Sequence, residues 1–206
     1  MHGKWCVDNE RIILVSYHYD IIDDFLSESD MDNFYETFTH GGFPWTLMTK
    51  VNENAGENDF QFAHKYVDDR VEVYDGAIEA LRPIFRELYI DGDTVLNDGG
   101  LKYEVYRAKT NLFIKTDTSR GLGFHHDITN LGDNYKTIIY YVNSNNGGTR
   151  FEDDTFIESV RNRALLFTGK ISHETVTQTD TNFRFNININ YNSSSTPLVK
   201  ENLNES

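Results

Sequence analysis

Three side chains in the second half of the sequence have the types and spacing of a metal site. His125 and Asp127 are two residues apart, and His173 follows well downstream. A β-strand alternates its side chains between two faces, so we expect His125 and Asp127 to point one way and His126 the other. Two imidazoles and one carboxylate on one face form the set that holds non-haem Fe(II) and leaves positions open.

A positively charged residue accompanies this set. Arg184 follows His173 on a predicted strand of its own. A guanidinium is permanently charged and can hold a carboxylate through two parallel hydrogen bonds. Together the four residues predict a site for iron and a dicarboxylic keto-acid. The alternative is that the His-x-Asp, one short match among seven histidines, is a surface or capping feature and His173 a hydrogen-bonded residue at a barrel rim.

Length and composition favour one folded domain. The chain has 206 residues, 38% hydrophobic and 14% aromatic, with only three prolines. That is enough apolar material for a real core, and it argues against long disordered segments. We expect a single domain over residues 1–206, in which 1–100 supplies N-terminal strands and supporting helices. Residues 101–192 would form the metal-binding barrel core and 193–206 a polar tail.

Charge and targeting signals narrow the class of protein. The net charge of −14 repels a polyanion unless a local basic patch overrides it, which argues against a nucleic-acid partner. No apolar stretch is long enough to span a membrane, and the N-terminus has no apolar signal region. The single cysteine, Cys6, fits a reducing compartment, so we expect a cytoplasmic location.

The first half of the chain mixes strands and helices. We expect strands over 11–22, 43–48 and 60–67, a polar loop over 51–59, and two helices. The first helix begins near Asp23, has Ser29 or Asp30 as a cap, and ends at the glycines 41–42. The second covers 77–89, with a slight kink at Pro83. His64 is interpreted as a wall or core residue, with contact to a substrate as the alternative.

The second half has the pattern of short strands and turns that is typical of a sandwich or barrel. Strands are expected over 103–114, 136–143, 163–167 and 182–191, with a turn at Asn145–Gly148. The last strand alternates strictly, so its phenylalanines and isoleucines would face a core. The residues between them would point to the opposite, inward face of the strand, and they are Arg184, Asn186, Asn188 and Asn190. The same rule predicts further inward-facing residues on two other strands: Arg107, Lys109, Asn111, Phe113, Thr137, Ile139 and Tyr141.

These pieces resemble one known family. His125-His126-Asp127, the strand after it, the Gly-Gly-x-x-Phe segment of Gly147–Phe151, and His173 with Arg184 occur in the order found in Fe(II)/2-oxoglutarate-dependent dioxygenases. The prolyl-hydroxylase-like branch is the most similar. The sequences of segments 107–112, 139–153 and 160–167 are similar to those of oxygenases encoded by tailed phages, especially marine ones. A phage origin would place the protein in the cytoplasm of a host cell.

The resemblance implies a fold and a set of roles. The fold would be mainly β with flanking helices, a double-stranded β-helix or cupin-like jelly roll. His125, Asp127 and His173 would hold Fe(II). Arg184 and Tyr141 would bind the distal carboxylate of 2-oxoglutarate. Phe113 stands where prolyl hydroxylases have a tyrosine, so Asn111 would replace that contact, and Asn186 stands where Ser or Thr is usual.

The implied activity is hydroxylation with release of succinate and CO2, using O2 and 2-oxoglutarate. A peptidyl or prolyl side chain is the favoured substrate, and a nucleobase, nucleoside or small metabolite is the alternative. Two other classes stay open. One is a non-catalytic barrel used as a binding or virion module, which would have lost a metal ligand. The other is a cupin-like metal enzyme that needs no keto-acid, against which Arg184 argues.

Overall fold

An eight-stranded antiparallel sheet carries most of the residues predicted to face the site. The computed structural model describes residues 3–8, 11–16, 18–88, 105–129, 132 and 134–193. The strands lie in the order β3-β11-β8-β13-β7-β5-β4, and β6 pairs with β5. Their bounds are β3 (Tyr19–Ile22), β4 (Thr46–Met48), β5 (Gln61–Asp68), β6 (Val71–Glu72), β7 (Val105–Ile114), β8 (Tyr135–Tyr141), β11 (Arg163–Thr168) and β13 (Phe183–Asn192).

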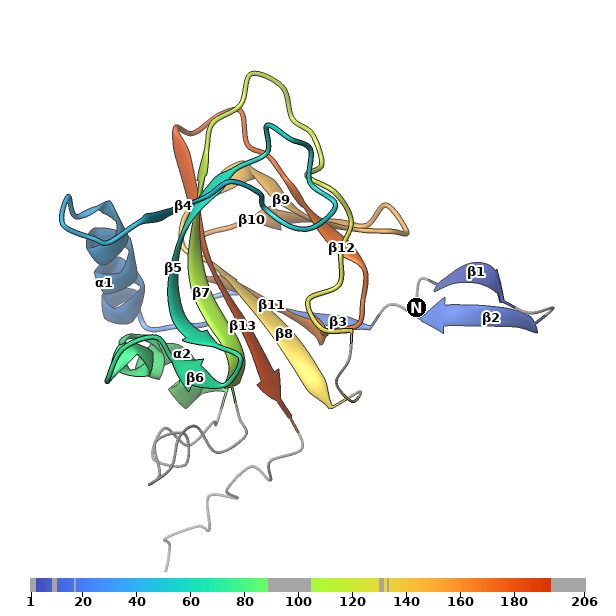
Figure 1. Ribbon diagram of the computed structural model, residues 1–206, viewed down its shortest axis with the longest axis horizontal. Helices are drawn as coiled ribbons and strands as arrows, with labels where there is room; N and C mark the ends of the chain where they lie inside the picture. Colours follow the sequence, from blue (N-terminus) through green and yellow to red (C-terminus); the bar gives the residue numbers. More distant parts are fainter. Residues whose placement is uncertain are drawn as a thin grey trace, which may run out of the picture.

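A second, three-stranded sheet lies across one face of the large sheet (Figure 1). Its order is β10 (Phe156–Ser159), β9 (Asn145–Phe151) and β12 (His173–Val176). A small apolar cluster joins the two sheets, in which Phe151 stacks on Tyr19 at 5.3 Å and meets Phe167 edge-on at the same distance. The inner face of the large sheet is therefore the face toward β9, β10 and β12. A separate hairpin pairs β1 (Gly3–Asp8) with β2 (Arg11–Ser16).

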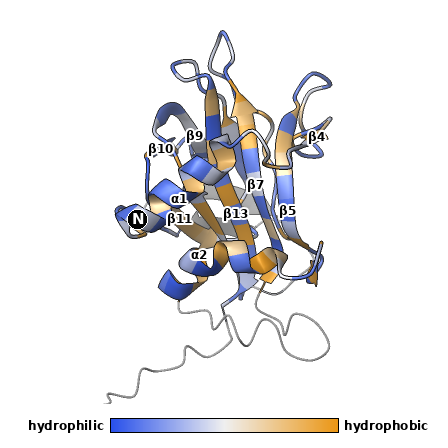
Figure 2. Ribbon diagram, turned by 90° about the vertical axis from the view of Figure 1, so that its left-hand side faces the viewer, coloured by the Kyte–Doolittle hydropathy of each residue, from blue (hydrophilic) through white to orange (hydrophobic). Residues whose placement is uncertain are grey.

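The helices cover the outer face of the large sheet. They are α1 (Glu28–Thr39), a 3₁₀ turn (Ala77–Leu81) and α2 (Arg82–Glu87). Figure 2 shows α1 and α2 over β13 and β7, whose ribbons alternate between hydrophobic and hydrophilic residues. The outer core combines Phe34 and Phe38 of α1 with Phe185, Ile187 and Ile189 of β13. This confirms the predicted alternation of the last strand and leaves its arginine and asparagines on the inner face.

Several predicted boundaries are wrong for local reasons. The segment 11–22 forms two strands, β2 and β3, which belong to different sheets. Ser27 is the cap of α1, since its hydroxyl accepts from the Asp30 amide at 3.2 Å. Pro83 lies in the first turn of α2, where its missing N–H costs no hydrogen bond, so it starts a helix and kinks none. The predicted tail beyond Ser193 lies outside the described residues.

The predicted turn at Asn145–Gly148 is also wrong, because these residues belong to strand β9. A Cβ on Gly148 would lie 2.1 Å from the carbonyl oxygen of Ile157, and one on Gly147 would lie 2.9 Å from that of Val176. The two glycines thus allow close approach by β10 and β12 and do not supply a positive φ. The Gly148 carbonyl also accepts a hydrogen bond from Arg184, which links this strand to the site.

Candidate active site

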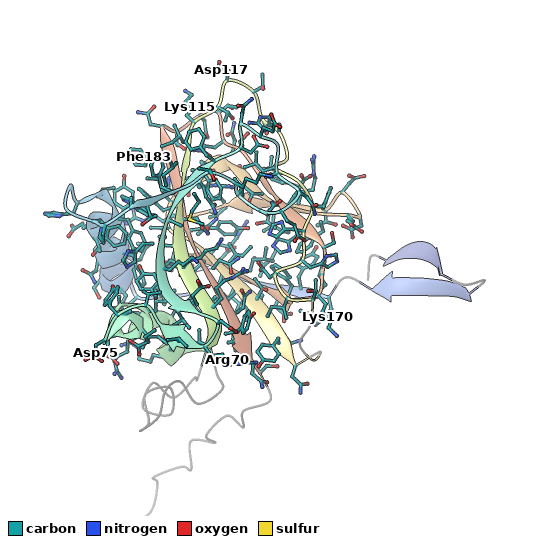
Figure 3. The ribbon with its side chains drawn as sticks, viewed as in Figure 1. Arg70, Asp75, Lys115, Asp117, Lys170 and Phe183 are labelled. Atoms are coloured by element: carbon teal, nitrogen blue, oxygen red, sulfur yellow. The ribbon has the colours of Figure 1, made fainter. Side chains whose placement is uncertain are left out.

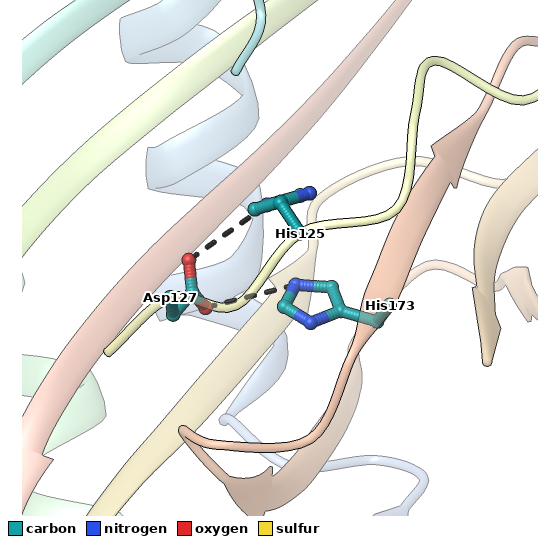
Figure 4. A group of neighbouring side chains, drawn as sticks. All are labelled: His125, Asp127 and His173. Carbon is teal, nitrogen blue, oxygen red and sulfur yellow. Dashed lines mark ion pairs between the residues drawn. The ribbon is translucent and has the colours of Figure 1, made fainter. Parts of the chain in front are cut away.

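His125, Asp127 and His173 come together as predicted (Figure 4). Their candidate ligand atoms all lie within 4.8 Å of one another. The Asp127 carboxylate has Oδ1 4.0 Å from Nε2 of His125 and Oδ2 3.7 Å from Nε2 of His173. The two imidazole rings are 4.6 Å apart between centroids. This is a compact set of two nitrogen donors and one carboxylate.

The backbone explains why the two histidines meet. His125 and His173 form an isolated antiparallel bridge, in which each amide donates to the other's carbonyl at 2.9 and 3.0 Å. Residues paired in this way project side chains to the same face. The expected strand over His125–Asp127 is wrong. His125 forms an isolated β-bridge, and the residues next to it have no regular secondary structure. His126 is exposed, in agreement with its predicted outward direction.

The loop before β5 holds the segment that carries His125. The Nδ2 of Asn52 donates to the carbonyls of Leu122 and Gly123, both at 3.1 Å, and the Nδ2 of Asn54 donates to that of Phe124 at 2.7 Å. Gly123 has a φ of +89°, and a Cβ there would lie 2.6 Å from the Asn54 carbonyl oxygen. Sequence reasoning assigned residues 51–59 to a polar loop and missed this role, because the contacts span about 70 positions of the chain.

Backbone carbonyls orient both histidine rings. The Nδ1 of His173 lies 3.0 Å from the Ile171 carbonyl oxygen, and that of His125 lies 3.3 Å from the Gly123 carbonyl oxygen. A carbonyl only accepts, so the contact of His173 assigns its proton to Nδ1 and leaves the lone pair of Nε2 toward Asp127. The Nδ1 of His125 also lies 3.2 Å from the Asn52 side-chain nitrogen, so its contacts orient the ring without fixing the tautomer. Burial and the neighbouring His173 lower the pKa of His125 to about 4. That ring is therefore in the neutral form that a metal needs.

Three donors surround the Asp127 carboxylate. Arg107 forms an ion pair with Oδ1 at 2.7 Å, while the Thr137 hydroxyl at 3.0 Å and the Asn188 amide at 3.3 Å donate to Oδ2. Burial alone would raise the pKa of Asp127, but the neighbouring His173 and Arg107 outweigh it and hold the pKa below its usual range. Strand alternation placed these donors on the inner face, but sequence reasoning gave them no role.

Arg184 is fully buried on the same face. Its Nη1 donates to the Gly148 carbonyl at 3.1 Å, and its guanidinium lies over the Phe113 ring at 4.6 Å. The Nε and Nη2 atoms are buried and have no hydrogen-bond partner among the described residues. Burial lowers the pKa of Arg184 to about 10. A buried cation without a counter-ion is costly, so two unpaired N–H groups here are what a carboxylate would satisfy.

Tyr141, Asn111 and Asn186 form the row of side chains next to Arg184. Asn186 is in register with Asn111 on one side and Tyr141 on the other. The Asn111 amide donates to the Asn186 side-chain oxygen at 2.8 Å, while the Asn111 oxygen is buried without a partner. The Tyr141 hydroxyl donates to Thr149 at 2.7 Å, and burial raises the pKa of Tyr141 to about 12. All the residues predicted to bind the keto-acid thus share one face with the candidate metal ligands.

His64 lies away from this cluster. Its Nδ1 contacts the Pro44 carbonyl oxygen and its Nε2 the Tyr74 hydroxyl, each at 3.1 Å. The ring packs against Phe43 and Tyr66, and Tyr66 belongs to the outer core. His64 is therefore a wall residue of the outer face, which was the favoured interpretation.

The donor set fits a metal and a keto-acid. Two imidazoles and one carboxylate suit Fe(II), because they leave coordination positions for other ligands. The unpaired donors of Arg184 suit the far end of a dicarboxylate. Asn188 adds a buried side-chain oxygen that also has no partner among the described residues. The unsatisfied atoms of Arg184, Asn188 and Asn111 all belong to the paired strands β13 and β7.

Comparison with known proteins gives the fold. No protein-family sequence model matches the chain, and no protein with a curated description matches it. A 2OG-Fe(II) oxygenase family oxidoreductase from Burkholderia pseudomallei is similar in structure, with a TM-score of 0.60, 13% identity and 85% of each chain covered. A Pseudomonas putida prolyl-4-hydroxylase has a TM-score of 0.52 and 12% identity over 86% of this chain and 93% of its own.

A third similar structure is a prolyl hydroxylase from Trichoplax adhaerens in complex with a hypoxia inducible factor peptide fragment. It has a TM-score of 0.51 and 17% identity, over 85% of this chain and 83% of its own. The chain therefore has the jelly-roll fold of the 2OG-Fe(II) oxygenases, mainly β with flanking helices, as predicted. Among the described residues, no helix has the length and apolar character needed to cross a bilayer.

Proposed function

We propose that this protein is an Fe(II)- and 2-oxoglutarate-dependent dioxygenase that hydroxylates a primary substrate and releases succinate and CO2. The observation that carries the proposal is the pairing of two features on one inner face. One is the His125, Asp127 and His173 cluster, and the other is buried Arg184 with two unpaired donors. A metal enzyme without a keto-acid has no need of the second feature.

The spacing along β13 supports this pairing. Asn188 contacts Asp127, and Arg184 is four residues earlier on the same face of the strand, about 14 Å away along the backbone. The long arginine side chain and an extended five-carbon diacid can share this span, with Asn186 and Asn111 between them. Arg184 would hold one carboxylate of 2-oxoglutarate, and the other end would reach the metal.

The chain's own residues would bind, orient and shield the reacting groups. His125, Asp127 and His173 would hold iron. The Ile171 carbonyl keeps His173 in the metal-binding tautomer, and Asn52 and the Gly123 carbonyl orient the ring of His125. The apolar cluster around Tyr141, Phe151 and Phe167 closes one side to water. When bound, iron and 2-oxoglutarate supply the activation of O2.

The substrate class is part of the proposal. A peptidyl or prolyl side chain is favoured, supported by the resemblance to the prolyl-hydroxylase-like branch and by an acidic surface that disfavours polyanions. A nucleobase or a small metabolite is the alternative. The test is to incubate the protein with Fe(II), 2-oxoglutarate and O2 against peptides, nucleosides and amino acids. Mass spectrometry should show succinate and a product heavier by one oxygen atom. Product that forms without 2-oxoglutarate would contradict the proposal.

Tyr141 gives a matched-pair prediction for co-substrate binding. We expect Tyr141→Phe to raise the 2-oxoglutarate concentration needed for half-saturation while iron binding is unchanged. One hydrogen bond to a charged group contributes roughly 1.5–3 kcal/mol, and this hydroxyl is on the inner face beside Arg184. Asn111→Ala should also raise the 2-oxoglutarate concentration needed for half-saturation, since Asn111 belongs to the same row of side chains as Tyr141.

The control is Tyr140→Phe. Its hydroxyl donates to Asn162 at 3.1 Å in the outer core, so the change should lower thermal stability slightly and leave the 2-oxoglutarate requirement alone. Titration of 2-oxoglutarate with each variant checks both outcomes. A requirement that changes in Tyr140→Phe but not in Tyr141→Phe would exclude a contact between Tyr141 and the co-substrate.

A further inference from the structure

Lys109 is a cation beside the candidate metal ligands that no contact explains. It lies on the inner face of β7, directly across from Asn188 of β13, which donates to Asp127. Its side chain is half-buried, and no ion pair or hydrogen bond involves its ammonium in the described part of the chain. Its other cross-strand neighbour, Lys65, is already paired with Asp68 at 2.6 Å.

Arg107 is the inward-facing residue next to Lys109 on the strand, about 7 Å away along the backbone. Its guanidinium uses Nη2 for Asp127 and Nε for Asn190. The side chain is still 26% exposed, so part of the guanidinium faces out from the metal cluster. Two cations in a chain with a net charge of −14 thus flank one carboxylate.

The charge balance of the loaded site leaves these two cations in excess. Fe(II) brings two positive charges, Asp127 one negative, 2-oxoglutarate two negative and Arg184 one positive, so these charges cancel. The nearby Arg150 and Glu174 cancel as an ion pair at 2.5 Å. The two carboxylates that act on Lys109 are then Asp127, which the metal already neutralises, and Asp68, which is paired with Lys65. Two positive charges at a half-buried site without matching negative charges favour the binding of an anion.

The position of Lys109 separates this anion from the keto-acid. Arg184 is in register with Phe113, and Lys109 is four residues before Phe113 on β7, about 14 Å away along the strand. The row of Asn111 and Asn186 lies between them. Lys109 is level with Asn188, which donates to Asp127, so it lies at the metal end of this span and away from the carboxylate that Arg184 would hold.

We propose that Lys109, assisted by Arg107, binds a carboxylate or phosphate group of the primary substrate beside the metal. The inference rests on the proposed function, because it assumes that metal and 2-oxoglutarate occupy their sites. It narrows the substrate class to molecules that carry an anion close to the carbon that is hydroxylated. The buried, unpaired oxygen of Asn188 gives such a substrate a hydrogen-bond acceptor at the same place.

The test uses the full chain loaded with Mn(II), a paramagnetic stand-in for Fe(II), and with 2-oxoglutarate. Inorganic phosphate and acetate are the probes, followed by the relaxation of their phosphorus and carbon nuclei. We expect at least one of the two to show saturable relaxation that places it near the metal without coordinating it. The two arms distinguish a phosphate-bearing from a carboxylate-bearing substrate.

Lys109→Met should weaken binding of that probe about tenfold or more, the loss expected for one charge-assisted hydrogen bond. Lys109→Arg should retain it, and Lys65→Met is the matched control, because Lys65 is the adjacent lysine with a partner of its own. Unchanged probe binding in Lys109→Met, or wild-type relaxation by direct coordination only, would overturn the inference while the proposed function stands. If Lys109→Met does not fold, the wild-type measurement still tests the inference, because it shows whether the probe binds near the metal without coordinating it. Failure of Mn(II) and 2-oxoglutarate to bind would overturn both.

Discussion

Replacing Asp127 with alanine should abolish the binding of Fe(II), and so should His125→Ala or His173→Ala. Each change removes one of three donors whose ligand atoms lie within 4.8 Å of one another. Asp127→Ala should be the most severe, because it also leaves two imidazoles without the only carboxylate of the set and Arg107 without its partner at 2.7 Å. Iron content after reconstitution and desalting measures the outcome.

His126→Ala is the control for this prediction. His126 is adjacent to two of the proposed ligands but exposed, so its loss should leave both iron content and thermal stability as in the wild type. Circular dichroism should show that the three ligand variants keep their β structure, since the apolar cores contain none of these side chains. Full iron retention in Asp127→Ala, or loss in His126→Ala, would rule out the assignment.

Arg184→Ala should weaken the binding of 2-oxoglutarate by about 2–5 kcal/mol, the usual effect of removing one partner of a buried charge pair. The structure adds a second expectation. Because Arg184 is fully buried with two unpaired donors, the protein without co-substrate should lose little stability, and Arg184→Met should be neutral or stabilising. Titration of 2-oxoglutarate and thermal melting of the protein without co-substrate measure the two effects separately.

Arg70→Met is the matched arginine control. Arg70 lies at the opposite end of the molecule from Lys115 and Phe183, which mark the end where Arg184 begins its strand (Figure 3). Its Nη2 donates to the Tyr135 hydroxyl at 3.0 Å, so its loss should affect stability alone. Unchanged affinity in Arg184→Ala together with a large loss of stability would mean that Arg184 is a structural residue.

Strict alternation made the inner face predictable from sequence. In β13, every second residue from Phe183 to Ile189 is phenylalanine or isoleucine, and only one register buries these under α1 and α2. Arg184, Asn186 and Asn188 must then face inward. The same reasoning gave the correct direction for Tyr141 and Asn111, whose neighbours in the sheet follow from the register.

What sequence reasoning could not reach depends on contacts between distant segments. The strand expected at His125–Asp127 is replaced by a single bridge to His173, held by side chains of a loop about 70 residues earlier. Gly147 and Gly148 have the composition of a turn, but they lie in β9 because β10 and β12 approach too closely for a side chain. Local propensity carries no information about such approaches. The expected domain bounds and the roles of the site residues stay predictions.

The most direct test of the central claim is an anaerobic titration of the wild-type protein with Fe(II) and then with 2-oxoglutarate. The proposed site predicts a metal-to-ligand charge-transfer absorption that needs both components and saturates at one iron and one 2-oxoglutarate per chain. In Arg184→Ala the same absorption should develop only at much higher 2-oxoglutarate, and in Asp127→Ala it should not develop. Iron binding by the wild type with no such absorption at any 2-oxoglutarate concentration would contradict a keto-acid-dependent site.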